Sequence, residues 1–277
     1  MTDWKARQNG DGGWAYSRGC SWTEPTVFVL LAQSALTPDR ESLLKGRNFL
    51  GSIARQDGGY SPLPGVEEST WVTALVALLP EDAVQQRQRR LAIDWLKSRT
   101  GRESGWRYQF QQRLGGNKED YPEGWPWFPG AAAWVIPTSL GILAFERALR
   151  RGDAERDELQ TRVEAAKRFL MAHMCADGGW NHGGNKALGR DGDSYPETTG
   201  IALLALNGMA SARMERAKAA ARKHLAGCRT AEGIAWLRMG LAAHGESAEP
   251  VFDPVCRTNM DEALMALAAA VRNPLLA

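Results

Sequence analysis

Gln8-Asn9-Gly10-Asp11-Gly12-Gly13-Trp14 begins a pattern that returns along this chain. A polar segment, one or two glycines and an aromatic ring recur as Gln56-Asp57-Gly58-Gly59-Tyr60, as Glu103-Ser104-Gly105-Trp106 and as Ala176-Asp177-Gly178-Gly179-Trp180. The first three aromatic residues are evenly spaced, and a longer interval precedes the fourth. Repetition at intervals of this size indicates one supersecondary unit that is used several times.

Two kinds of helical segment alternate with these glycine-aromatic signatures. Amphipathic, charged segments come before a signature, as in residues 41–55, 82–99 and 155–174. A further segment of this kind, residues 214–227, follows the last signature. A threonine and an almost wholly apolar segment come after a signature, as in residues 200–206. A helix with one polar face suits an outer layer, and a helix that is apolar all round is buried on most sides.

This alternation predicts an all-α, two-layer barrel, which is a single α/α toroid of five to six helical hairpins around a central cavity. Residues 230–245 and 259–273 are predicted to be the closing pair, because repeat arrays often end in atypical units. One domain is expected over residues 1–277, since the repeats begin near the start and weaker helical segments continue to the end.

The turns and the starts of the inner helices have predictable local roles. Paired glycines such as Gly58-Gly59 can take positive φ and reverse the chain, and the preceding aspartate can bond to turn amides. Glu24, Glu68 and Glu197 are predicted at the same place in successive units. A glutamate that recurs in this way favours a structural role in helix capping or in an ion pair.

Bulk composition excludes several classes of function. With 44% hydrophobic residues and a net charge of +2, the 277-residue chain is an ordinary globular protein without a basic run for nucleic acid. Its four cysteines are scattered, so neither a disulfide framework nor a paired-cysteine site is predicted. No segment has the pattern of a signal peptide or a membrane span. We therefore predict a cytoplasmic protein with no metal and no cofactor.

At its glutamine-glycine-aromatic segments the chain resembles the squalene cyclase and protein prenyltransferase superfamily. The segments from Gln8 to Trp14 and from Gln56 to Tyr60 are similar to the glutamine-tryptophan repeats of triterpene cyclases. The helices that open on Thr and continue with Ala and Leu are similar as well. The resemblance covers most of the chain, and it implies a single α/α toroid with an isoprenoid in its central cavity.

The resemblance also implies where chemistry would start. Class II cyclases of this superfamily protonate an alkene with the middle Asp of an Asp-x-Asp-Asp or Asp-x-Asp-Thr-Thr motif. The nearest match is Tyr195-Pro196-Glu197-Thr198-Thr199, in which Glu197 takes the place of the middle Asp. Glu197 and Asp193 are the resulting catalytic candidates, with Asp193 as a helping carboxylate. Because an intact Asp-x-Asp-Asp motif is absent, two alternatives stay open: an enzyme and a non-catalytic binding protein.

Aromatic side chains supply the candidates for substrate binding. One long insertion, residues 108–137, and a second one, residues 181–195, carry several aromatic rings. Loops of this length are often functional, and we expect these two to cap the cavity. A π-rich wall suits an isoprenoid or a carbocation. The predicted substrate-binding residues are Trp22, Trp71, Trp125, Trp127, Trp134, Trp180, His182 and Tyr195.

Three functions stay open. The first is a terpene-cyclase-like enzyme, and the second is a non-catalytic barrel that binds an isoprenoid or a protein, with peripheral membrane contact as a further alternative. The third, a polysaccharide lyase or other sugar enzyme, ranks last because the Arg and Lys residues lie mainly on the predicted outer helices. A prenyltransferase zinc site would need Asp, Cys and His. Only Cys175 and Asp177, with His173 or His182, have these types, and their order is reversed.

Overall fold

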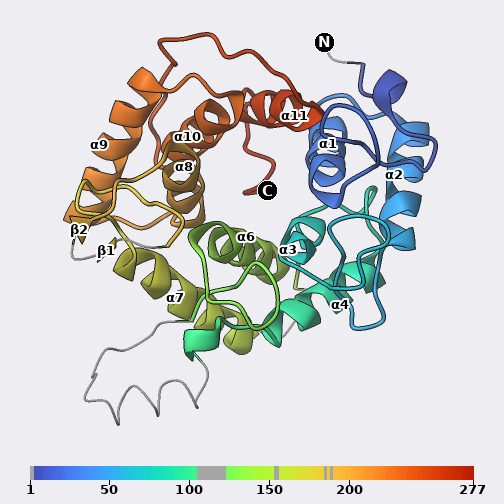
Figure 1. Cartoon of the computed structure of the whole chain (residues 1–277), viewed down its shortest axis with the longest axis horizontal. Helices are drawn as coiled ribbons and strands as arrows, with labels where there is room; N and C mark the ends of the chain where they lie inside the picture. Colours follow the sequence, from blue (N-terminus) through green and yellow to red (C-terminus); the bar gives the residue numbers. More distant parts are fainter. Residues whose placement is uncertain (1–2, 105–122, 153–155, 184–185, 188–189) are drawn as a thin grey trace.

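The helices form a closed two-layer ring (Figure 1). The computed structural model describes residues 3–104, 123–152, 156–183, 186–187 and 190–277. Within these residues the inner layer consists of α1 (Thr23–Leu36), α3 (Val72–Ala77), α6 (Val135–Arg151), α8 (Pro196–Ala205), α10 (Ala231–Ala243) and α11 (Asn259–Ala268). The outer layer consists of α2 (Arg40–Ser52), α4 (Gln86–Lys97), α7 (Arg156–Ala172) and α9 (Ala212–Gly227). The predicted all-α toroid is confirmed.

The ring closes where α11 packs against α1. Asn259, the first residue of α11, donates its side-chain amide to the Ala15 carbonyl at 2.9 Å and its backbone N–H to the Tyr16 carbonyl at 2.6 Å. Arg7 and Glu262 form an ion pair at 2.8 Å across the same junction. The remaining short elements of the described residues are two 3-10 helices, η1 (Lys5–Arg7) and η2 (Arg102–Ser104), and an antiparallel pair of strands, β1 (Lys186–Ala187) and β2 (Arg190–Asp191).

The distribution of apolar residues explains the two layers. Every residue of α8 from Thr198 to Ala205 is buried, whereas α4 buries chiefly one face that includes Ala92, Ile93 and Leu96. α10 and α11 close the ring as predicted, but both lie in the inner layer and therefore do not form an inner–outer hairpin. Residues 244–258, which connect them, contain no helix.

One hydrogen bond recurs in four units and joins the signature aromatic residue to the next inner helix. The backbone N–H of that residue donates to a threonine hydroxyl at 2.9 to 3.0 Å, in the pairs Trp14–Thr26, Tyr60–Thr73, Trp125–Thr138 and Trp180–Thr199. The three indole N–H groups also donate to backbone carbonyls, those of Trp4, Leu96 and Leu170. Each tryptophan thereby ties an earlier segment to the start of an inner helix.

The third unit corrects the assignment made from the sequence. Trp125, and not Trp106, supplies the aromatic residue that bonds to the inner-helix threonine. The even spacing of Trp14, Tyr60 and Trp106 is misleading, because the insertion of this unit lies before its signature and not after it. Trp106 itself lies outside the described residues.

The glycine turns have the backbone that the sequence predicts. Positive φ angles of 93°, 89° and 97° occur at Gly12, Gly58 and Gly178. Asp57 accepts hydrogen bonds from the Gly59 N–H at 3.0 Å and from the Ser69 hydroxyl at 2.7 Å. The corresponding pairs of bonds are made by Asp11 and Asp177. These aspartates are therefore explained by the turn.

The variant Thr138→Val is expected to destabilise the protein by about 1 to 3 kcal/mol. Valine keeps the shape of the side chain but removes the hydroxyl that accepts the buried Trp125 N–H at 2.9 Å. Urea denaturation measures the loss. Thr70→Val is the matched control, because within the described residues the buried Thr70 hydroxyl has no hydrogen-bond partner. Equal losses in the two variants would contradict the assigned role.

Candidate functional site

The starts of the inner helices surround a central pocket of about 150 Å³. Four helices each contribute a residue of the first turn and another four positions later, a spacing that puts both on one helix face. The pairs are Glu24 and Phe28 of α1, Ile136 and Leu140 of α6, Glu197 and Ile201 of α8, and Glu232 and Trp236 of α10. Trp71, just before α3, and Trp127, from the loop before α6, complete the wall.

Three carboxyl groups face this pocket without a cationic partner. Tyr16 donates a short hydrogen bond from its hydroxyl to Glu24, and the Thr230 hydroxyl donates to Glu197 at 3.2 Å. Among the described residues, no Lys, Arg or His lies within ion-pair distance of Glu24, Glu197 or Glu232. Among the described residues, the pocket therefore holds three carboxyl groups and no side chain that forms an ion pair with them.

Burial changes the acidity of two of these groups, Glu232 and Glu24. Burial raises the pKa of Glu232 to about 7, and the neighbouring charges of Glu24, Glu197 and Asp261 add to the rise. Burial also raises the pKa of Glu24, while the hydrogen bond from Tyr16 opposes that rise. Near neutral pH, Glu232 is therefore a carboxyl group that can both give and accept a proton.

Aromatic rings form much of the remaining wall. Trp71 and Trp127 meet edge to face with ring centroids 4.8 Å apart, and the Trp71 backbone N–H donates to the Trp127 carbonyl at 3.0 Å. Phe28 and Trp236 meet edge to face at 5.8 Å. Such pairs are held in defined orientations, so the pocket presents rigid π surfaces beside its carboxyl groups. The predicted binding residues Trp71 and Trp127 are thus brought together here.

A wider groove of about 720 Å³ adjoins the pocket and shares Glu197 and Glu232 with it. The groove runs along the start of α10 toward the loop before α11. Its wall includes Arg229, whose guanidinium lies 4.4 Å from the centre of the Phe252 ring, and Asp261 of α11. A ligand longer than the pocket can therefore extend along this groove.

Four other predicted binding residues lie around the helix starts and do not line the central pocket. Trp22, Trp134 and Tyr195 immediately precede α1, α6 and α8. His182 lies between two of these rings, with its centroid 6.2 Å from that of Trp134 and 5.3 Å from that of Tyr195. Trp134 and Tyr195 are 37% and 46% exposed, so they form an aromatic surface outside the pocket.

Trp125 and Trp180 are packing residues, which corrects the prediction that they bind a substrate. Their side chains are only 2% and 0% exposed and belong to the hydrophobic core. Their backbone and indole N–H groups already have the partners of the recurrent helix connection. A buried ring with this role has no surface left for a ligand.

Asp193 also differs from the prediction. Its side chain is exposed and is absent from the wall of the central pocket, whereas Glu197 faces that pocket. The two candidate acids are therefore not brought together as a pair. Asp193 lies before the residue that caps α8, and the start of the helix directs only the later Glu197 inward.

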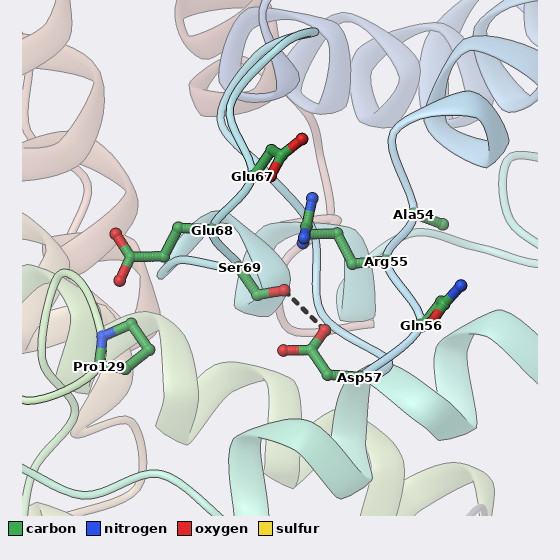
Figure 2. Close-up of a pocket in the computed structure, with 8 residues that line it drawn as sticks. All are labelled: Ala54, Arg55, Gln56, Asp57, Glu67, Glu68, Ser69 and Pro129. Carbon is green, nitrogen blue, oxygen red and sulfur yellow. Dashed lines mark hydrogen bonds between the residues drawn. The ribbon is translucent and has the colours of Figure 1, made fainter.

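Glu68 is not the counterpart of Glu24 and Glu197. It lies in an open surface groove of about 580 Å³ beside Glu67, Arg55 and Pro129 (Figure 2). The reason is a shift in register, because Tyr60 bonds to the hydroxyl of Thr73 and not to that of Thr70. Trp71 consequently takes the pocket-facing place at the start of α3.

Glu232 is the pocket residue that sequence reasoning missed. Its signal is a glutamate two residues after the capping Thr230, at the start of an apolar helix, much as Glu24 and Glu197 open α1 and α8. The segment lacks a preceding glycine-aromatic signature, so the repeat pattern alone does not mark it.

Comparisons with known proteins identify the fold. No family model and no curated protein matches the sequence. The type II terpene cyclase MstE from Scytonema, solved with its substrate geranylgeranyl dihydroxybenzoate, is 14% identical with a TM-score of 0.55, over 96% of this chain and 73% of MstE. MstE has also been solved with its product, merosterolic acid A. The fold is a terpenoid cyclase-like α/α toroid.

Two further solved structures mark the limits of this likeness. A protein from Actinoplanes is 17% identical with a TM-score of 0.50, over 95% of this chain and 75% of that protein. A polysaccharide lyase is 11% identical with a TM-score of 0.51, over 91% of this chain and 90% of the lyase. Since one toroid supports unrelated chemistries, the terpenoid cyclase-like fold leaves function to be argued from the pocket.

The described residues include neither a metal-binding cluster nor a membrane-spanning helix. No three His, Cys, Asp or Glu side chains there lie close enough together to hold a metal ion. The His173 ring stacks on that of Phe169, with the ring centroids 4.0 Å apart. The Asp177 carboxylate accepts hydrogen bonds from the Gly179 N–H and the Ser194 hydroxyl of its turn. None of the described helices is long and apolar enough to cross a membrane. The cytoplasmic location stays a prediction.

Proposed function

We propose that the central pocket binds an isoprenoid and starts its cyclisation by donating a proton from a carboxyl group. The observation that carries this proposal is Glu232, whose pKa of about 7 keeps much of it protonated near neutral pH beside an aromatic wall. Glu197 faces the same pocket and is the second candidate acid. The fold that this chain shares with substrate-bound MstE supports the proposal.

In the proposed reaction Glu232 first donates a proton and finally accepts one. The π electrons of a ligand alkene take the carboxyl proton and form a new C–H bond, which leaves a carbocation on the ligand and a carboxylate on Glu232. A second alkene then attacks the cation and closes a ring. Loss of a proton ends the reaction, and the carboxylate accepts that proton. The faces of Trp71, Trp127 and Trp236 stabilise the cation while it exists.

The size of the site suggests how a long substrate would lie. The pocket has a volume of about 150 Å³, which is roughly the volume of five water molecules. It therefore accommodates only the reacting end of a linear isoprenoid. The adjoining groove would receive the remainder. Exposed Phe128, Trp134 and Tyr195 supply apolar surface for peripheral contact with a membrane, from which such a substrate would be taken.

A non-catalytic isoprenoid-binding barrel is the second candidate, and a specific observation favours it. Alkene protonation demands a strong acid, whereas Glu232 is a weaker acid than an ordinary glutamate. The helping carboxylate that the sequence predicted, Asp193, lies outside the pocket. In this alternative the same aromatic wall binds the ligand without changing it.

Product analysis separates these candidates. Linear isoprenoids, free and diphosphorylated, are incubated with the protein, and products are identified by gas chromatography with mass spectrometry. A cyclised product that falls about 100-fold or more in Glu232→Gln would support the enzyme. Glu68→Gln, in the open surface groove, is the matched control and is expected to keep full turnover. Bound but unchanged isoprenoid would favour the binding protein, and neither binding nor turnover would contradict both.

A further inference from the structure

The central pocket has the charge and the wall of a site for an organic cation. Glu24, Glu197 and Glu232 reach it from α1, α8 and α10, and each comes from the first turn of its helix. Helix N-termini favour ionised carboxylates, whereas burial raises the pKa of Glu24 and Glu232, and the charges of Glu24 and Glu197 add to the rise at Glu232. A bound positive charge would relieve the repulsion among all three groups at once.

The aromatic wall adds a second, independent preference for positive charge. Trp71, Trp127 and Trp236 line the same pocket, and tryptophan is the side chain whose ring face attracts cations most strongly. The fixed edge-to-face contact between Trp71 and Trp127 holds these two rings in place before any ligand arrives. A preformed cage of this kind loses little entropy on binding.

The shape of the pocket favours an alkylated amine over a bare metal ion. In the described part of the chain, the three carboxyl groups do not lie close enough together to ligate one ion. Ile136, Leu140 and Ile201 add apolar surface to the wall of the same pocket. Alkyl groups around a nitrogen would contact these side chains, while the charge of the nitrogen remains within reach of the glutamates.

We propose that this pocket binds the positively charged amine group of a small organic ligand, with Glu24, Glu197 and Glu232 supplying the opposite charge and the three tryptophans supplying ring faces. The inference uses the same pocket as the proposed function, but it concerns the charge of the bound group and not its reaction. The wider groove, whose wall carries Asp253 and Asp261 as well as Arg229 and Arg257, would hold the rest of such a ligand.

A matched pair of probes tests the charge directly. Choline carries a trimethylammonium group, and its neutral isostere carries a tert-butyl group in the same place. Isothermal titration calorimetry at pH 8 is expected to show choline binding about tenfold or more tightly than the isostere. Equal affinity for the two probes, or no choline binding at millimolar concentration, would overturn the inference.

Two variants locate the binding. Glu197→Gln is expected to lower choline affinity by about tenfold and to leave the weak affinity for the neutral isostere unchanged. Glu68→Gln, in the open surface groove, is expected to bind choline like the unaltered protein. Thermal unfolding of each variant first establishes that it is folded. Equal choline affinity in folded Glu197→Gln and in the unaltered protein would place the site elsewhere and overturn the assignment.

The cation test and the product analysis fail separately. Selective choline binding without isoprenoid turnover would support this inference and contradict the proposed enzyme. Turnover of an isoprenoid without any selectivity for choline would support the enzyme and overturn the cation site.

Discussion

Replacing Gly200 with alanine is expected to destabilise the protein by about 3 kcal/mol. Gly200 lies where α8 crosses α10, and an added Cβ would stand 2.3 Å from the Trp236 carbonyl carbon and 2.5 Å from the Leu237 nitrogen. These atoms are backbone, so no side-chain rotation can make room. On the facing helix, a Cβ at Gly240 would meet the Gly200 carbonyl oxygen at 2.4 Å. Urea denaturation measures the loss.

The close crossing also positions the pocket, because α8 carries Glu197 and α10 carries Glu232 and Trp236. Gly51→Ala is the matched control, since its Cβ would meet only the side-chain nitrogen of Gln88 at 3.6 Å. Alanine within a helix is favoured over glycine, so this variant should gain about 0.5 to 1 kcal/mol. If Gly200→Ala were as stable as the unaltered protein, the helices would not be in contact as described.

Replacing Glu232 with glutamine is expected to stabilise the protein by about 1 to 3 kcal/mol at pH 8. The pKa of Glu232 is about 7 in the folded protein, above the ordinary value of 4.5. Between these two values the unfolded chain releases its proton while the folded chain keeps it. Folding stability therefore falls as pH rises through this window, and glutamine, which carries no charge, removes the loss. Because solvent partly reaches this side chain, the gain is expected to be smaller than the free energy that corresponds to the whole pKa difference.

Urea denaturation from pH 4 to pH 8 measures this effect. At pH 4 the carboxyl group is protonated in the folded protein and largely so in the unfolded chain, so the two proteins are expected to differ little. Glu68→Gln, in the open surface groove, is the control. A gain in Glu232→Gln that is the same at every pH would mean that packing, and not the charge of Glu232, causes it.

The fold could be predicted from the sequence because it depends on local sequence patterns. Glycines at positive φ, an aromatic residue after them and a threonine at the next helix each act within a short stretch of chain. The helical spacing of apolar residues then assigns each helix to a layer. The third unit was misread because an insertion displaced its signature from Trp106 to Trp125, and local spacing does not show on which side of a signature an insertion falls.

The candidate site was predicted in part. Glu197, Trp71 and Trp127 face the central pocket, whereas Asp193 lies on the surface and Trp125 and Trp180 lie in the core. An abundance of tryptophan in a sequence does not distinguish a ring that binds a ligand from one that ties two helices together. Only the hydrogen bonds and exposure of each ring make that distinction.

The sequence by itself determined that the chain folds as alternating inner and outer helices with glycine-aromatic turns, since these features depend on residues close together in the chain. The tertiary structure alone decided which residues meet in the pocket. Glu24, Glu197 and Glu232 are far apart in the sequence, and closure of the ring through α11 and α1 brings their helices together. The same proximity and burial raise the pKa of Glu232, so its acidity is a property of the ring and not of any segment.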